Sequence, residues 1–203
     1  MKNELEPDAV AAMASMRCLD GVVMITRAST RLVSERRRCR DCRCATQEIA
    51  WLCVAFGMDV AAFSPSLDAD EAYESGVLFA DSPQALFARS THVVLSCPLN
   101  EGTRNLVNRD LIESMPSEDC GRHLVNVARG GVAVEADIAA CLNEGLLTSY
   151  ATDVFEEEPC TSSPLFGLDG FSATPHVGAA TKEAQDAVSL MVADRVMDEL
   201  AGD

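Results

Sequence analysis

Residues 124–131 read Leu-Val-Asn-Val-Ala-Arg-Gly-Gly, and this stretch indicates the fold. The run 124–127 is typical of a short buried strand, and Arg129 follows at its carboxyl end with two glycines behind it. In open α/β sheets, ligands bind just outside the carboxyl ends of the strands. An arginine there can hold a carboxylate through two parallel hydrogen bonds. Taken alone, such a sequence is more often a solvated turn, so the rest of the chain decides between the two interpretations.

Strand and helix patterns alternate from residue 47 onward. Short connections between alternating elements predict a parallel sheet with helices on both faces. The strands are nearly continuous apolar runs, as expected where both faces of a sheet are covered. The fold class is therefore α/β, a Rossmann-like doubly wound parallel sheet. Strands are expected at 58–63, 76–79, 92–96, 123–127, 147–153 and 171–174, and helices at 47–56, 69–74, 83–88, 108–115, 135–144 and 182–200.

The first 46 residues fit this pattern less well. Residues 8–19 predict a helix, and 21–25 could form a strand. Between residues 26 and 44 neither apolar period is present, and this segment holds seven of the sixteen basic residues. Its Cys-x-x-Cys-x-Cys spacing resembles part of a zinc site, but no second Cys/His pair stands at a finger-like distance. We therefore expect no metal and interpret the segment as an irregular basic loop.

Composition limits the classes of partner and compartment. The chain of 203 residues carries a formal net charge of -16, which argues against nucleic acid and anionic membranes as partners. No apolar run approaches the ~20 residues that span a bilayer. Cysteines number nine, an odd count, and no signal peptide is recognisable. These features favour a reducing compartment, so a cytoplasmic location is expected.

Polar residues follow three of the expected strands. Arg129 follows the first, Asp153 and the acidic run 156–158 follow the second, and His176 follows the third. In a parallel sheet these ends converge on one crevice. An arginine, a carboxylate and a histidine together can supply an electrophile, an orienting group and an acid/base. Each residue alone has a structural interpretation, but their joint placement favours a functional one.

Four phrases are similar to the nucleotide-binding domain of the D-isomer specific 2-hydroxyacid dehydrogenase family, and within it most similar to D-3-phosphoglycerate dehydrogenases. They are AFGMDVAAFSPSL (55–67), ARSTHVVLSCPLNEGTRNLVN (88–108), VNVARGGVAVEADIAACLNEGLLTSYATDVFEEEP (125–159) and SPLFGLDGFSATPHVGAATKEAQDAV (163–188). The resemblance implies an NAD-dependent oxidoreductase that acts on the CH–OH group of a small D-2-hydroxy acid similar to 3-phosphoglycerate, or on the matching 2-oxo acid. It also implies a homodimer for an intact chain.

The resemblance implies a role for each polar residue at the strand ends. Arg129 would bind the substrate carboxylate and polarise its carbonyl, and His176 would be the general acid/base. Glu158 would pair with His176 and favour its protonated form, because a nearby carboxylate stabilises a positive charge. Asp153 would face the nicotinamide end of the cofactor. The cofactor-binding residues implied are Ser64, Cys97, Val127, Ala128, Arg129, Asp153, His176, Val177, Gly178 and Ala179.

The chain departs from the family pattern at the phosphate loop. The family's G-x-G-x-x-G is replaced by residues 40–46, and no glycine stands between Gly21 and Gly57. Side chains there block the close approach of backbone to pyrophosphate that the glycines allow. Ser64 stands where NAD enzymes carry the acid that binds the ribose. The serine removes one reason to reject NADP, but no arginine follows to receive a 2′-phosphate, so NAD is favoured.

The expected domain organisation follows from the extent of the resemblance. Residues 1–46 would be a partial linking helix and an atypical basic segment, and 47–203 an NAD-binding domain with a C-terminal helix. The family's substrate domain is not expected in this chain. Two alternatives therefore stay open. The chain could be a non-catalytic NAD(H)-binding or interaction module, although such a module need not keep Arg129, Glu158 and His176, or an inactive fragment whose sheet lacks its first strand.

A shift of reading frame in the coding sequence is one hypothesis for the missing glycines. If the arginines of RCRDCRC (38–44) use CGN codons, the shifted frame can encode a run such as x-V-G-I-V-G. That run is typical of the strand that enters a dinucleotide loop, although the remaining glycines are not recovered. Sequencing of the transcript across these codons tests the hypothesis, and an unshifted, continuous frame would contradict it.

Overall fold

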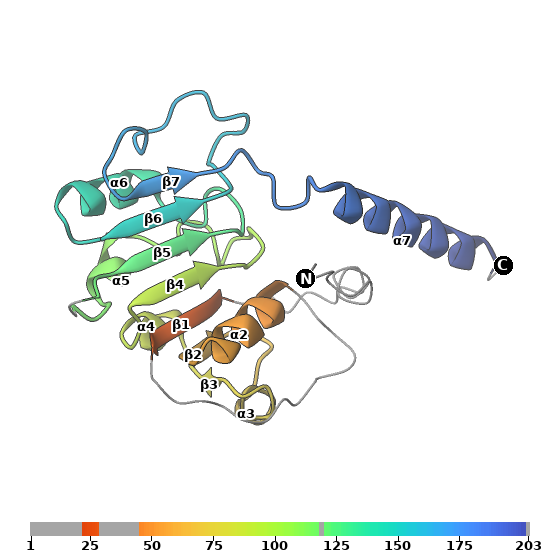
Figure 1. Cartoon of the computed structure of the whole chain (residues 1–203), viewed down its shortest axis with the longest axis horizontal. Coiled ribbons are helices and arrows are strands. Elements are labelled where there is room, and N and C mark those ends of the chain that lie inside the picture. The colour runs from red at the N-terminus through yellow and green to blue at the C-terminus, as the bar shows by residue number, and fades with distance from the viewer. Residues whose placement is uncertain (1–21, 29–44, 118–119, 202–203) are drawn as a thin grey trace, which may run out of the picture.

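The computed structural model describes residues 22–28, 45–117 and 120–201, and a single sheet forms the centre of this part of the chain (Figure 1). Its seven strands lie in the order β3-β2-β1-β4-β5-β6-β7. The strands are β1 (Val22–Ala28), β2 (Met58–Phe63), β3 (Leu78–Phe79), β4 (His92–Leu95), β5 (His123–Asn126), β6 (Ser149–Thr152) and β7 (Phe171–Ala173). The helices are α2 (Ala45–Ala55), α3 (Ala69–Glu74), α4 (Pro83–Phe87), α5 (Arg109–Glu113), α6 (Glu135–Asn143) and α7 (Lys182–Ala201).

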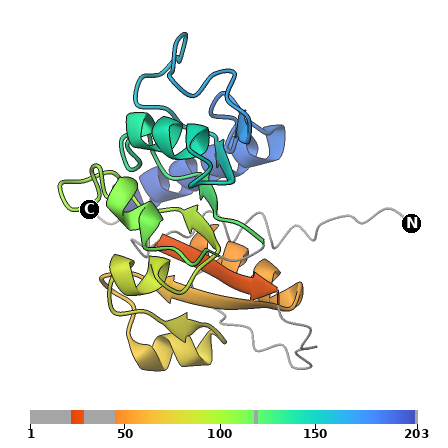
Figure 2. The same ribbon diagram turned by 90° about the vertical axis from the view of Figure 1, so that its left-hand side faces the viewer.

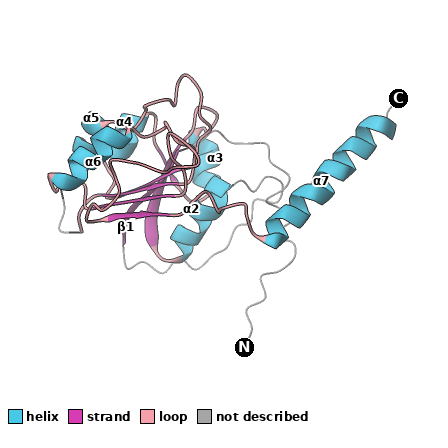
Figure 3. Cartoon of the chain, turned by 90° about the horizontal axis from the view of Figure 1, so that it is seen from above, coloured by secondary structure: helices cyan, strands magenta, loops and turns pink. Residues whose placement is uncertain are grey.

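The predicted α/β class is confirmed, and every element expected after residue 46 is present with its ends moved by at most two residues. Strands β4 to β7 pair in parallel, and β2 pairs in parallel with β3. Helices α4, α5 and α6 cover one face of the sheet and α2 covers the other (Figures 2 and 3). The carboxyl ends of β4 to β7 therefore lie along one edge of the sheet, which we call the carboxyl edge.

Strand β1 corrects the prediction of an entirely parallel sheet, because it runs antiparallel to both of its neighbours. Val22 pairs with Phe63 and Leu95 at the carboxyl edge, whereas Ala28 pairs with Met58 at the opposite edge. A tight glycine turn into the next helix would require a parallel first strand, but no glycine stands between residues 21 and 57. Nothing in the sequence therefore imposes that direction on β1.

The position of β1 also corrects two other expectations. The centre of the sheet is not left unpaired, since β1 hydrogen-bonds with β2 on one side and β4 on the other. Residues 26–28, which were expected to begin the irregular basic loop, continue the strand. The predicted helix at 8–19 and the cysteines at 39, 42 and 44 lie outside the described residues. Within the described residues, no group of three or more His, Cys, Asp or Glu side chains could hold a metal ion.

The main hydrophobic core lies between the sheet and helices α4 to α6. Its fully buried side chains include Phe87, Ile112, Leu124, Ile138 and Tyr150. Burying one large apolar side chain contributes about 1.5–3 kcal/mol, so this cluster anchors the half of the sheet that carries the carboxyl-edge loops.

The opposite face has a smaller core, formed around Ala50 of α2 and Val60 of β2. The amphipathic helix predicted at 47–56 leaves Trp51, Leu52 and Phe56 exposed on its outer side. Helix α7 projects away from the sheet (Figures 1 and 3). Apolar side chains are exposed along its length. No helix in the described part of the chain is long and apolar enough to cross a membrane.

Candidate active site

The candidate site is built from the loops that follow β5, β6 and β7. In the parallel ladder Asn126 pairs with Thr152, and Thr152 pairs with Ala173. The three chains therefore leave the sheet side by side at the carboxyl edge. This arrangement brings together Arg129, the segment 153–158 and His176.

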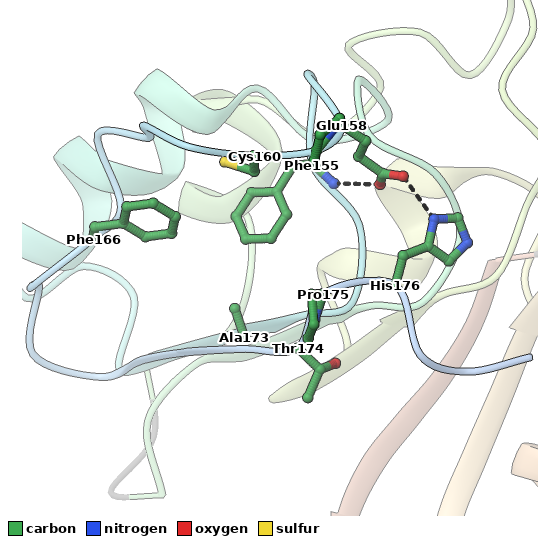
Figure 4. A pocket seen from close by; sticks show the side chains of 9 residues that line it. Phe155, Glu158, Cys160, Phe166, Ala173, Thr174, Pro175 and His176 are labelled. Atoms are coloured by element: carbon green, nitrogen blue, oxygen red, sulfur yellow. Dashed lines mark hydrogen bonds and ion pairs between the residues drawn. The ribbon is translucent and has the colours of Figure 1, made fainter. Parts of the chain in front are cut away.

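A hydrogen-bonded pair of Glu158 and His176 is the centre of the site (Figure 4). Nδ1 of His176 lies 2.7 Å from Oε2 of Glu158, and both side chains remain partly exposed. The other carboxylate oxygen accepts a hydrogen bond from the Phe155 amide at 3.0 Å. An ionised carboxylate can only accept, so Nδ1 of His176 is the donor. That assignment leaves Nε2 as the ring atom that can exchange a proton with a bound molecule.

The charge state of Glu158 follows from these contacts. The hydrogen bond from His176 is the largest cause that lowers the pKa of Glu158 below its usual value. The Phe155 amide and the positive charge of Arg129 lower this pKa further, against the effect of partial burial. Glu158 is therefore ionised at neutral pH and able to stabilise a positive charge on the imidazole.

Arg129 lies in the turn after β5, with its side chain exposed. Its Nη1 donates to the Ala128 carbonyl at 2.6 Å. The turn is shaped by Asn126, which is 1% exposed at the end of the strand. The Asn126 amide donates to the Arg129 carbonyl at 3.2 Å, and its oxygen accepts from the Ala128 amide at 3.0 Å. Sequence analysis missed this role, although an asparagine inside an apolar run was a usable signal.

Gly130 joins the turn after β5 to the loop after β6. A Cβ atom at this position would overlap the backbone carbonyl of Phe155. Only glycine therefore allows the two loops to approach this closely. Because Phe155 also donates its amide to Glu158, the contact connects the Arg129 turn to the Glu158–His176 pair.

Asp153 directly follows β6, and both of its carboxylate oxygens accept hydrogen bonds from the chain around His176. The donors are the Thr174 hydroxyl and the amides of Val177 and Gly178, the amides at 2.8 and 2.9 Å. Burial raises the pKa of Asp153, but these three hydrogen bonds outweigh it and hold the pKa below its ordinary value. The role expected for Asp153 at the nicotinamide stays a prediction.

A cavity of about 540 Å³ lies beside the Glu158–His176 pair (Figure 4). Apolar groups form most of its wall, and the two ionisable side chains stand at one side of it. Small-molecule sites commonly combine a mostly apolar lining with a few polar groups in this way. The lining residues are Phe155, Glu158, Pro159, Cys160, Phe166, Ala173, Thr174, Pro175 and His176.

The remaining predicted cofactor residues are distributed over the same edge. Cys97 and Ala128 are buried beneath the carboxyl edge. Val127 and Val177 are each 44% exposed in the loops that follow β5 and β7, and the Ala179 carbonyl accepts from Gln185 at 2.7 Å.

Ser64 stands apart from this group. It is buried after β2, which is separated from β4 by β1, and its hydroxyl lies 3.1 Å from that of Ser66. The structure therefore brings together Arg129, Asp153, Glu158 and His176, but not Ser64.

Comparisons with known proteins match most of this chain. Residues 45–178 match the family model described as "D-isomer specific 2-hydroxyacid dehydrogenase, NAD binding domain". The D-3-phosphoglycerate dehydrogenase of Methanocaldococcus jannaschii is 36% identical over 157 residues, which are 77% of this chain and 29% of that protein. The (S)-sulfolactate dehydrogenase of Chromohalobacter salexigens is 36% identical over 151 residues, 74% of this chain and 48% of that protein.

Solved structures give the same result. An NADPH-dependent glyoxylate/hydroxypyruvate reductase from Sinorhizobium meliloti, in complex with NADP and sulfate, superposes with a TM-score of 0.68 at 30% identity. The match covers 77% of this chain and 49% of that chain. The D-mandelate dehydrogenase of Rhodotorula graminis gives a TM-score of 0.66 at 29% identity, over 72% of this chain and 43% of the other. The chain thus spans about half or less of the length of these relatives.

The first prediction concerns Gly130. Gly130→Ala should destabilise the fold by about 1–3 kcal/mol, because the added methyl group must push two backbone segments apart. Gly102→Ala is the matched control, since its nearest neighbour is a side-chain oxygen at 3.4 Å, and it should change stability by no more than about 0.5 kcal/mol. Urea denaturation of both variants measures the difference. Equal losses in the two variants would contradict the role assigned to Gly130.

The second prediction concerns the charge state of Glu158. His176→Ala should raise the pKa of Glu158 toward its usual value of 4.5, because the hydrogen bond from His176 is the largest cause that lowers this pKa. In the unchanged protein the stabilisation from the pair is present above that usual value and is lost as the pH falls through the lowered pKa. Carboxyl ¹³C NMR titration measures the shift. Glu144, whose pKa is lowered by Arg109, is the control and should not move; an unchanged Glu158 titration would refute the assignment.

Proposed function

This chain belongs to the D-isomer specific 2-hydroxyacid dehydrogenase family through its NAD-binding domain, and we propose that its carboxyl-edge site oxidises the CH–OH group of a small D-2-hydroxy acid, or reduces the matching 2-oxo acid. The observation that carries the proposal is the Glu158–His176 hydrogen bond of 2.7 Å beside Arg129. A positioned acid/base with its own orienting carboxylate is what proton transfer to or from a hydroxyl requires.

The described residues fit the nicotinamide end of NAD. Val127 and Val177 expose apolar surface at the carboxyl edge, beside the acid/base pair, and would hold the flat ring between them and the substrate. At the pyrophosphate end the described residues do not provide the usual strand-to-helix junction, because β1 ends at the edge of the sheet opposite the carboxyl edge. We therefore assign no pyrophosphate contact, and we keep Ser64 as the residue proposed near the adenosine ribose.

In the proposed reaction Arg129 binds the substrate carboxylate and draws electron density from the adjacent oxygen. Nε2 of His176 removes the hydroxyl proton as the C–H bond breaks and the C=O bond forms. Glu158 holds the ring through Nδ1 and stabilises the imidazolium that results. NAD, when bound, supplies the acceptor for the hydride. In the reverse direction the same imidazolium returns the proton to the carbonyl oxygen.

The substrate proposed first is 3-phosphoglycerate. Relatives that match this chain are named for phosphoglycerate, sulfolactate and hydroxypyruvate, so a short 2-hydroxy or 2-oxo acid is the shared chemical class. The strongly acidic charge supports small-molecule rather than nucleic-acid or membrane partners. A cytoplasmic homodimer, bound to NAD rather than NADP, completes the proposal.

Experiments on the purified chain and four variants test the proposal. NADH titration, followed by its fluorescence and by the melting temperature, should show saturable binding and stabilisation. Oxidation of 3-phosphoglycerate, followed by NADH absorbance, should fall at least about 100-fold in His176→Ala.

Glu158→Gln should reduce turnover strongly, whereas Glu157→Gln, an exposed neighbour, should leave it unchanged. Arg129→Lys should raise KM for the acid with little change in NADH affinity, since lysine cannot form the two-pronged contact.

The outcomes separate the alternatives. Binding of NADH without turnover of any 2-hydroxy acid would favour the non-catalytic module. No NADH binding, together with a non-cooperative melt, would favour the inactive fragment. Turnover that survives His176→Ala would refute the assigned acid/base.

A further inference from the structure

The amino end of helix α6 is capped by a residue from another loop. Val134 precedes the helix, and its side chain makes no hydrogen bond to the first turn. The first amides of a helix need acceptors, which a nearby polar side chain usually supplies. Here the acceptor comes from the loop after β6, because the Glu156 carboxylate accepts a hydrogen bond from the Glu135 amide at 3.1 Å. A negative charge at this end also complements the helix dipole.

Glu135 binds the same loop with both of its carboxylate oxygens. Oε1 accepts a hydrogen bond from the Glu156 amide at 2.9 Å, and Oε2 accepts one from the Ser163 hydroxyl at 2.7 Å. The Ser163 oxygen in turn accepts a hydrogen bond from the amide of Leu165, whose side chain is fully buried. One side chain of α6 therefore holds both ends of the segment 156–163.

Glu158 lies inside the segment that Glu135 holds. Residues 156–159, 161 and 162 are exposed, so burial contributes little to fixing this part of the loop. Helix α6, by contrast, is anchored in the main core, where Ile138 and Cys141 are fully buried. Hydrogen bonds from a rigid helix to an exposed loop limit the positions that the loop can adopt. The position of Glu158 thus depends on a helix that contributes neither member of the Glu158–His176 pair.

We propose that Glu135 is a positioning residue, which holds the loop after β6 so that the Glu158 carboxylate stays directed at Nδ1 of His176. The catalytic consequence rests on the proposed function, but the positioning itself does not. Glu135 acts on the pair through the loop, because its carboxylate oxygens bind Glu156 and Ser163. A role in helix stability alone would change the unfolding of the chain, but not the titration of Glu158 in the folded protein.

An NMR experiment compares Glu135→Ala with Glu135→Gln in the full chain. Glu135→Ala should accelerate hydrogen exchange of the Glu156 amide at least about tenfold, because that amide loses its acceptor. In a carboxyl ¹³C titration it should also raise the pKa of Glu158 toward its usual value, since the hydrogen bond from His176 that lowers this pKa would weaken. Glu135→Gln keeps an oxygen acceptor and should reverse most of both changes.

Glu144→Ala is the matched control. It truncates a glutamate at the other end of α6 and removes an ion pair with Arg109, so it weakens the same helix without touching the loop. Neither the exchange of the Glu156 amide nor the titration of Glu158 should change in this variant. Equal changes in Glu135→Ala and Glu144→Ala would make Glu135 a stabiliser of the helix only, and would overturn the proposal.

Turnover tests the catalytic consequence. Glu135→Ala should lower kcat about fivefold or more while KM changes by less than about threefold, because Arg129 keeps its place and the loss concerns the acid/base pair. Glu135→Gln should restore most of kcat.

The remaining outcomes also decide the proposal. An unchanged Glu158 titration in folded Glu135→Ala would contradict it. If Glu135→Ala fails to fold, Ser163→Ala decides, since it removes only one of the hydrogen bonds to Glu135. A smaller rise in the pKa of Glu158 in that variant supports the positioning, and no rise overturns it. If the unchanged chain shows neither NADH binding nor turnover, the proposed function fails, while the NMR measurements still decide the positioning.

Discussion

Parallel pairing of β5, β6 and β7 in register is the constraint on which the site depends. Because Asn126, Thr152 and Ala173 stand opposite one another, the three loops that follow must leave the sheet at adjacent points. The buried core under α4 to α6 makes this register costly to change, since a slip by one residue would turn apolar side chains toward solvent. Arg129, Glu158 and His176 are therefore held close together by a sheet that none of them stabilises.

Hydrogen bonds from the backbone then convert proximity into a defined geometry. The Phe155 amide donates to Glu158, and the amides of Val177 and Gly178 donate to Asp153. These hydrogen bonds fix the orientation of each carboxylate. Gly130 allows two of the loops to approach closely, because the Phe155 carbonyl occupies the space that a side chain at this position would fill. In the acidic run after β6, Glu158 binds the proposed acid/base and Glu156 exchanges two hydrogen bonds with Glu135, so the run is not simply a solvated face.

The two halves of the sheet differ in how completely they follow the family. The half from β4 to β7 has the order and direction of a doubly wound fold, and it carries the proposed acid/base. Strand β1 runs in the reverse direction, so it ends at the edge of the sheet opposite the carboxyl edge. A dinucleotide fold binds pyrophosphate at the junction between its first strand and the following helix, so the reversal of β1 separates the edge that carries the proposed acid/base from the usual pyrophosphate site.

Local patterns in the sequence by themselves determined the elements after residue 46, their parallel arrangement, and the three residues at the strand ends. Apolar runs, capping residues and short connections depend only on residues that are close in the sequence. They can therefore be recognised without knowledge of the tertiary contacts. Only the tertiary structure decided the direction of β1, the requirement for glycine at 130, the turn held by Asn126 and the partners of Asp153. The direction of β1, the glycine at 130 and the partners of Asp153 each depend on atoms from segments far apart in the chain, whereas Asn126 holds residues only two and three positions away. Strand direction in particular is decided by pairing partners once no glycine turn imposes it.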